Sequence, residues 1–161
     1  MHSWSTRWRT GKKGKAYREV QRGEPSSKPH RLSTIKNRTV STAIHQFRLG
    51  HGYFKDYLKR FSNNSNSSNN QCQCGKAPQT RKHLLLRCKL YWKERKRILG
   101  NATLPFLLGT KEGQQKLGEF VLETGVGTRK WLLGKQSEEN ERWGWGRLND
   151  EEEGDEGKEA E

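Results

Sequence analysis

The residues best suited to chemistry lie in one short stretch between positions 72 and 88. It contains all three cysteines of the chain, Cys72, Cys74 and Cys88, together with His83, and it reads C-x-C-G-x7-H-x4-C. Three thiolates and one imidazole are the ligand set of a Cys₃His site, in which Zn²⁺ is held in a tetrahedron of sulfur and nitrogen. Because four protein ligands leave no open position for water, the pattern predicts a structural zinc ion rather than a catalytic one.

Two other interpretations of the cysteines stay open. Cys72 and Cys74 could form a disulfide bond, with Cys88 left over. The odd number of cysteines argues against that pairing, and so does the lack of an apolar signal segment at the N-terminus. The three cysteines could also be unrelated buried thiols.

A tight turn and the start of a helix must position the four ligands. Gly75 permits a tight turn after the first pair. Thr80 is suited to cap a helix running to about Leu99 that carries the second pair. Five residues along an ideal helix correspond to about 140° of rotation, so we expect His83 just before the helix or in a distorted first turn.

Charge and composition divide the chain into three parts. Residues 1–135 hold 29 Lys and Arg against 7 Asp and Glu, whereas residues 136–161 hold 3 against 11. Leu, Ile, Val and Phe make up only about 17% of the chain, but 24 of these 28 residues lie between positions 38 and 135. We therefore expect a mostly disordered basic arm (1–37), a small helical domain (38–135) and a disordered acidic tail (136–161). The basic body should attract a polyanion.

Helical periodicity accounts for most of the central segment, so the predicted fold class is mainly α. Residues 39–49 carry Val40, Ile44 and Phe47 on one face, with Thr39 or Ser41 as the cap. Further helices are expected over residues 53–61, 111–123 and 128–133, with an apolar connector at 104–108. In the basic arm, Trp4 and Trp8 could lie on a short amphipathic helix that docks on a larger neighbour, although Pro25 and Pro29 favour disorder nearby.

Catalysis finds little support in the sequence. The seven acidic residues before position 136 are scattered, with no pair spaced for a two-metal site. No phosphate-binding loop or nucleophile elbow is present, and His51 has no partner placed for catalysis. We therefore expect no enzyme activity. No stretch approaches the ~18 apolar residues of a membrane span, and an intracellular location, cytoplasmic or nuclear, is expected.

Three strings carry a resemblance to a known family. Residues 39–61, TVSTAIHQFRLGHGYFKDYLKRF, resemble a segment near the C-terminal end of the polyproteins of non-LTR (LINE-type) retrotransposons, notably fungal Tad-like elements. Residues 72–88 are similar to the zinc knuckle that follows in that family, C-x-C-G…Q-T-x-x-H-L-L-L-x-C. Residues 120–133 resemble its closing block, F-x-x-x-T-G-x-x-T-R-x-W. The Ser/Asn run after position 61 is longer than usual for the family.

The resemblance implies a nucleic-acid-binding C-terminal region of a reverse transcriptase polyprotein, which often also holds an RNase H domain. The chain would then be a truncated fragment that grips RNA or DNA without catalysis of its own. Two alternatives remain: a structural appendage that braces a missing polymerase or RNase H partner, and a nonfunctional remnant. The cations around the zinc site are the expected phosphate contacts. They are Lys76, Arg81, Lys82, Arg87, Lys89, Lys93, Lys96 and Arg97.

Overall fold

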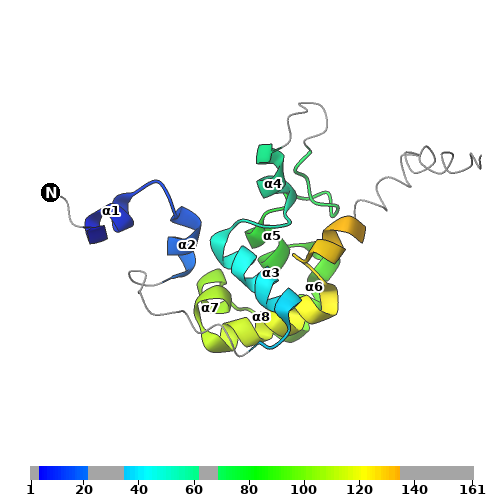
Figure 1. The fold of residues 1–161 in the computed structure, drawn as a ribbon. Coiled ribbons are helices and arrows are strands. Elements are labelled where there is room, and N and C mark those ends of the chain that lie inside the picture. The colour runs from blue at the N-terminus through cyan, green and yellow to red at the C-terminus, as the bar shows by residue number, and fades with distance from the viewer. Residues whose placement is uncertain (1–3, 22–34, 62–68, 135–161) are drawn as a thin grey trace, which may run out of the picture.

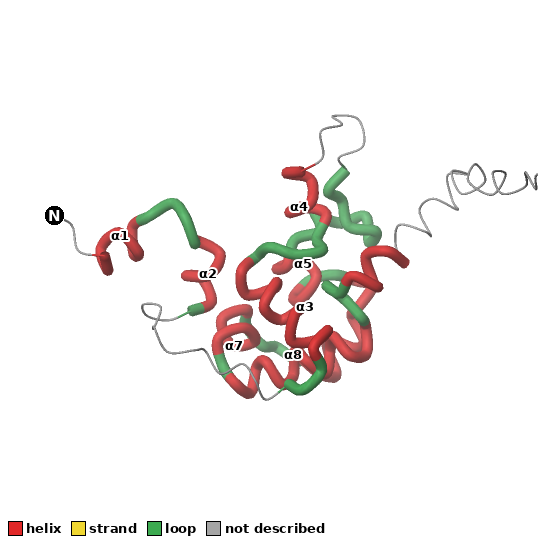
Figure 2. Tube along the Cα trace, viewed as in Figure 1, coloured by secondary structure: helices red, strands yellow, loops and turns green. Residues whose placement is uncertain are grey.

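The computed structural model describes residues 4–21, 35–61 and 69–134, and these form helices joined by loops. The tube in Figure 2 shows helix and loop throughout the described ranges. Their only strand-like pairing is an isolated antiparallel bridge between Gln71 and Pro78. The predicted mainly α fold class is confirmed. The predictions for residues 22–34, for the Ser/Asn run at 62–68 and for the acidic tail fall outside the described residues.

The centre of the body is built from helices α3 (Arg38–Leu49) and α8 (Lys111–Thr124). Both were expected from their periodicity, and they pack against each other, with α3 in the middle of the body and α8 along its bottom in Figure 1. Their inward side chains are buried: Val40, Ile44 and Phe47 on α3 and Leu117, Phe120 and Val121 on α8. The expected cap of α3 is wrong, because Asn37, rather than Thr39 or Ser41, accepts the hydrogen bond from the Val40 amide at 3.1 Å.

The apolar connector predicted at 104–108 is helix α7 (Leu104–Gly109). Pro105 lies in its first turn, where a missing N–H costs nothing, and Leu107 and Leu108 are buried. Helix α7 lies so close against α8 that a Cβ placed on Gly113 would clash with the carbonyl oxygen of Phe106. The last predicted short helix covers residues 129–134.

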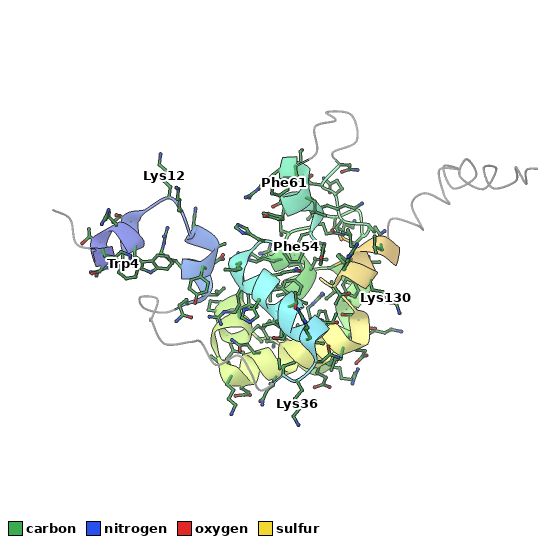
Figure 3. The ribbon with its side chains drawn as sticks, in the orientation of Figure 1. Trp4, Lys12, Lys36, Phe54, Phe61 and Lys130 are labelled. Carbon is green, nitrogen blue, oxygen red and sulfur yellow. The ribbon has the colours of Figure 1, made fainter. Side chains whose placement is uncertain are left out.

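The segment around the predicted ligands consists of short elements. They are α4 (Lys55–Leu58), η1 (Lys59–Phe61), α5 (Arg81–Leu86), η2 (Lys89–Tyr91), α6 (Trp92–Glu94) and the π-helical turn η3 (Arg95–Leu99). One continuous helix from Thr80 to Leu99 was expected, and this is wrong: the backbone leaves the helical region at Arg87, where φ is −134°. The break turns Cys88 back toward the other ligands. In Figure 3, Phe54 points into the body, whereas Phe61 lies at the outer end of this segment and is 66% exposed.

The N-terminal segment also differs from the expectation of a mostly disordered arm. Residues 4–20 form helices α1 (Trp4–Thr10) and α2 (Lys15–Val20). Figure 1 shows α2 beside the body and α1 extending away from it. For α2 the physical reason is long-range packing, because its Val20 side chain is buried in the core, whereas α1 buries no residue. A single apolar residue gave no periodic signal in the sequence.

Candidate metal centre

The four predicted ligands lie together in the structure. One ligand atom from each of Cys72, Cys74, His83 and Cys88 can be chosen so that all four lie within 4.8 Å of one another. The Cys72 and Cys88 sulfurs are 3.6 Å apart, and the Cys74 sulfur is 3.1 Å from His83 Nε2. Two sulfurs bound at about 2.3 Å to one tetrahedral zinc ion would be about 3.8 Å apart. The cluster is therefore suited to hold a single metal ion.

A tight loop presents the first two cysteines. The bridge between Gln71 and Pro78 closes its base, and the Cys72 amide donates to the carbonyl oxygen of Ala77 at 2.9 Å. At the tip, the Gly75 amide donates to the Cys72 carbonyl at 2.8 Å, and Gly75 has a φ of +69°. This left-handed conformation strains any residue with a Cβ, which explains the glycine directly after Cys74.

Helix α5 presents His83, and its C-terminal end presents Cys88. The hydroxyl of Thr80 accepts the amide of His83 at 3.1 Å, which confirms Thr80 as the cap and places His83 in the first turn. The Cys88 amide then donates to the His83 carbonyl at 2.7 Å after the helix has ended. Arg95 donates to the carbonyl of Cys88 at 2.6 Å and so fixes the backbone that carries the last ligand.

Backbone amides surround the three sulfurs in a repeated pattern. An N–H group two residues further along approaches each sulfur: that of Cys74 for Cys72, that of Lys76 for Cys74, and that of Leu90 for Cys88. Each of these hydrogen bonds lowers the pKa of its thiol, because it stabilises negative charge on the sulfur. Thiolates are the form that binds metal, so the loop provides partners for the metal-bound state.

Burial has the opposite effect on the thiols in the absence of metal. It raises the pKa of Cys72 to about 12 and also raises the pKa of Cys88. Burial opposes ionisation of Cys74 as well, but the backbone N–H of Lys76 and the neighbouring thiols outweigh it and lower its pKa. Cys72 and Cys88 are therefore protonated at neutral pH until a cation replaces their protons.

The histidine is ready to act as a ligand without losing a proton. Burial lowers the pKa of His83, and the positive charges of Arg95 and Arg87 lower it further. The imidazole is therefore neutral at pH 7, the form that coordinates metals.

The structure does not contain the alternative disulfide. All three cysteines are free thiols, including the Cys72 and Cys74 of the proposed pair. The unrelated-thiol interpretation does not fit either, since the three sulfurs converge on one imidazole.

Seven of the eight cations predicted to contact phosphate are exposed. In the sequence they lie among the metal ligands or within ten residues after Cys88. Arg97 already forms an ion pair with Glu123, which lies on α8. The prediction that Arg81 contacts phosphate has to be corrected, because Arg81 is buried, with only 8% of its surface exposed. A phosphate cannot reach a guanidinium that is enclosed by protein.

Arg81 instead joins three parts of the chain. Its guanidinium donates to the carbonyls of Phe47 and Arg48 at the end of α3, both at 2.9 Å, and to the carbonyl of Ala16 in α2 at 2.8 Å. It also pairs with the carboxylate of Glu19 at 2.6 Å. Since Arg81 is the first residue of α5, it connects the helix that carries His83 with both α2 and α3.

Two aromatic residues next to the site differ in environment. Tyr91 is partly buried and accepts a hydrogen bond from the indole of Trp131 at 2.7 Å. Trp92 is 54% exposed, with the Lys96 amine 5.3 Å from its ring centroid. The irregular turns after Cys88 explain the difference, because they rotate the chain away from the ideal helical period.

Sequence reasoning did not identify the positioning roles of Arg95 and Gln79. The 3.6-residue period of the predicted helix from Thr80 to Leu99 would place Arg95 on its inward face, which was a usable signal for a buried partner. Gln79 is buried, and its side-chain oxygen accepts the Lys55 amide at 3.0 Å, which ties the metal loop to α4. Nothing in the local sequence pointed to that contact, which spans 24 residues.

Comparisons with protein-family models, with curated proteins and with solved structures give no match to this chain. Within the described residues, no helix has the length and apolar character needed to cross a membrane.

Proposed function

We propose that this chain is a nucleic-acid-binding domain whose fold depends on a structural zinc ion. The observation that supports it best is the convergence of Cys72, Cys74, His83 and Cys88 within 4.8 Å. Soft thiolates with one imidazole suit Zn²⁺ better than Mg²⁺ or Ca²⁺, which take oxygen ligands. With three thiolates and one divalent cation the site carries a net charge of about −1, which nearby cations stabilise.

The proposed ligand follows from charge. Lys76, Lys82, Arg87, Lys89, Lys93 and Lys96 are exposed on the segment that holds the metal ligands. Residues 69–93 contain no Asp or Glu. A surface of this kind attracts the phosphates of RNA or DNA, and binding releases the counterions that surround them. In this proposal the zinc ion holds the cationic segment in shape and does not contact the nucleic acid.

We propose in addition that the chain derives from the C-terminal region of a non-LTR retrotransposon polyprotein. The support is the three sequence strings at 39–61, 72–88 and 120–133. In that setting the domain would hold template RNA or target DNA for the polymerase and would have no catalysis of its own. The strings include the metal ligands and the caps around them, so the proposal uses the same residues as the zinc site.

The test is the salt dependence of RNA binding by the full chain. Each phosphate contact contributes about 0.7–0.9 to the slope of log affinity against log salt. The double variant Lys93→Ala/Lys96→Ala should therefore reduce the slope by about 1.4–1.8. The matched control is Lys36→Ala/Lys111→Ala, which removes two exposed lysines outside the set and should leave the slope unchanged. A flat salt response of the parent protein would refute the proposal.

The alternative function is to brace a polymerase or RNase H partner. It is favoured by two large apolar side chains on the surface, Leu122 at 62% and Leu133 at 51% exposure. A partner that covers these side chains would remove their apolar surface from water. If the isolated chain fails to bind RNA but pairs with a separately supplied polymerase domain, and Leu122→Ser abolishes the pairing, this alternative replaces the first.

A further inference from the structure

Helices α1 and α2 are joined by a short loop, and residues 4–20 are called the hairpin below. Helix α2 lies on the body and α1 extends from it. Figure 3 shows Trp4 on the helix that lies away from the helical core, and Lys12 projecting from the loop that leads to α2. No residue of α1 is buried, and the Trp4 side chain is 53% exposed. An isolated helix of 7 residues is unstable in water, so local side-chain contacts must hold it.

Those contacts form an aromatic stack. The Trp4 and Trp8 rings are parallel within 7°, with centroids 6.2 Å apart. Tyr17 meets Trp8 edge-on at 6.2 Å, and the guanidinium of Arg18 lies 5.3 Å from the centre of the Trp8 ring. Arg18 also donates to the carbonyls of Gly11 and Lys13, which closes the turn between the helices. Trp4 is thus the outer member of an ordered stack.

The charge around the stack has one sign. Residues 4–18 include six Lys and Arg and no Asp or Glu. Five of these cations, Arg7, Arg9, Lys12, Lys13 and Lys15, are exposed. Glu19 is the next residue in the sequence, and its carboxylate forms an ion pair with Arg81. A partner of the hairpin must therefore be strongly anionic.

The hairpin is anchored at its base. Arg81 donates to the carbonyl of Ala16, and Arg48 donates to the side-chain oxygen of Gln21 at 2.8 Å. The buried Val20 side chain completes the attachment. The hairpin therefore presents an exposed aromatic ring and several cations from a position fixed on the body. This arrangement is typical of a binding surface and not of a solvated tail.

We propose that this hairpin is a second nucleic-acid contact and that it selects unpaired strands by stacking a base on Trp4. The exposed indole offers a base the same parallel contact that it makes with Trp8, while the five cations pair with phosphates. Bases in a duplex have both faces covered by neighbours, so only a single strand can use the ring. The inference extends the proposed function to a surface carried by different residues, so either can fail without the other.

The experiment compares single-stranded and double-stranded ligands on the full, zinc-loaded chain. Fluorescence anisotropy would follow a labelled oligothymidine of about 20 nucleotides and a duplex of the same length at fixed salt. The variants are Trp4→Ala, Trp4→Phe and the control Leu122→Ala, which truncates another exposed apolar side chain. Because α1 buries no residue, Trp4→Ala should leave the thermal unfolding temperature of the body unchanged.

Trp4→Ala should weaken binding of the single strand about tenfold, with less than a twofold effect on the duplex. Trp4→Phe should fall in between, and Leu122→Ala should have no effect. Equal losses on both ligands, or no loss on either, would overturn the inference. So would displacement of the oligothymidine by poly-glutamate as efficiently as by unlabelled nucleic acid, since the hairpin would then bind acidic protein. If Lys93→Ala/Lys96→Ala weakens binding while Trp4→Ala does not, the proposed function stands and only this inference fails.

Discussion

Arg81 shows how one side chain can decide the arrangement of distant helices. It is two residues from the ligand His83, yet its hydrogen bonds reach α2 and the C-terminal end of α3. The carbonyls at the end of a helix carry partial negative charge and lack partners within the helix, so a buried guanidinium satisfies them well. The ion pair with Glu19 is the weaker part, because that carboxylate is 49% exposed.

Replacement of Arg81 by alanine should therefore destabilise the protein by about 2–4 kcal/mol, since it leaves buried carbonyls without donors. Urea denaturation of the zinc-loaded chain measures the change. Lys82→Ala is the matched control, because Lys82 is the next residue and its side chain is exposed. It should lower the free energy of unfolding by no more than about 0.5 kcal/mol. Equal effects of the two substitutions would show that the Arg81 hydrogen bonds contribute nothing.

The thiols of the metal centre predict a pH dependence. The raised pKa values of Cys72 and Cys88 mean that both must lose a proton when a metal ion binds, whereas His83, with a lowered pKa, is already neutral at pH 7. Metal binding therefore releases at least two protons, and the apparent zinc affinity should fall about a hundredfold for each pH unit below 7. Competition with a zinc chelator of known affinity, repeated at several pH values, measures the slope. An affinity independent of pH would contradict thiolate ligation.

At the scale of elements, the contact between α7 and α8 depends on a glycine inside a helix. The atoms nearest to the position of a Cβ on Gly113 are backbone atoms of Phe106 and Leu107 in α7. A larger residue therefore cannot be accommodated by side-chain movement. The hydroxyl of Thr110 links the two helices, donating to the Phe106 carbonyl at 2.8 Å and accepting the Gly113 amide at 3.0 Å.

Gly113→Ala should thus destabilise the protein by about 3 kcal/mol, although alanine has a helix propensity about 1 kcal/mol better than that of glycine. The sign of the change is the informative result, and thermal or urea unfolding gives it. Gln115→Ala, at an exposed position of the same helix, is the control and should change stability by less than about 0.5 kcal/mol. A stabilised Gly113→Ala variant would mean that α7 does not pack against α8 in this way.

Elements with strong local signals were predictable, and those set by distant contacts were not. The periodicity of α3 and α8, the Thr80 cap and the ligand spacing all act over a few residues, and the structure confirms them. Helix α2 depends on contacts with α3 and with Arg81 of α5, which its own sequence could not reveal. Helix α1 coincides with the short helix at Trp4 and Trp8 that the sequence offered as an alternative to disorder. The break at Arg87 arises because Cys88 has to return to the metal loop, a constraint that helical periodicity does not contain. Arg81 was assigned to the surface because charged residues usually are exposed.

For the molecule as a whole, the metal centre and the helical core support each other. Hydrophobic residues make up only 29% of the chain, so the apolar interior is small for its length. Cys72 and Cys88 belong to the buried core, as do Leu84, Leu85 and Phe54. A bound ion would join the loop at 72–77 to α5 and, through Arg81, to the helices around it. Structural zinc sites can contribute on the order of 10 kcal/mol to folding, enough to decide whether such a body is stable.

The zinc content of the purified chain tests this account most directly. Elemental mass spectrometry on protein expressed and purified without added chelator should find about one zinc ion per chain, as one four-ligand site requires. Cys74→Ser and His83→Gln should lose the metal, whereas His45→Gln, at an exposed position of α3, should retain it. A parent protein without zinc, or zinc that persists at one ion per chain in both ligand variants, would contradict the central claim.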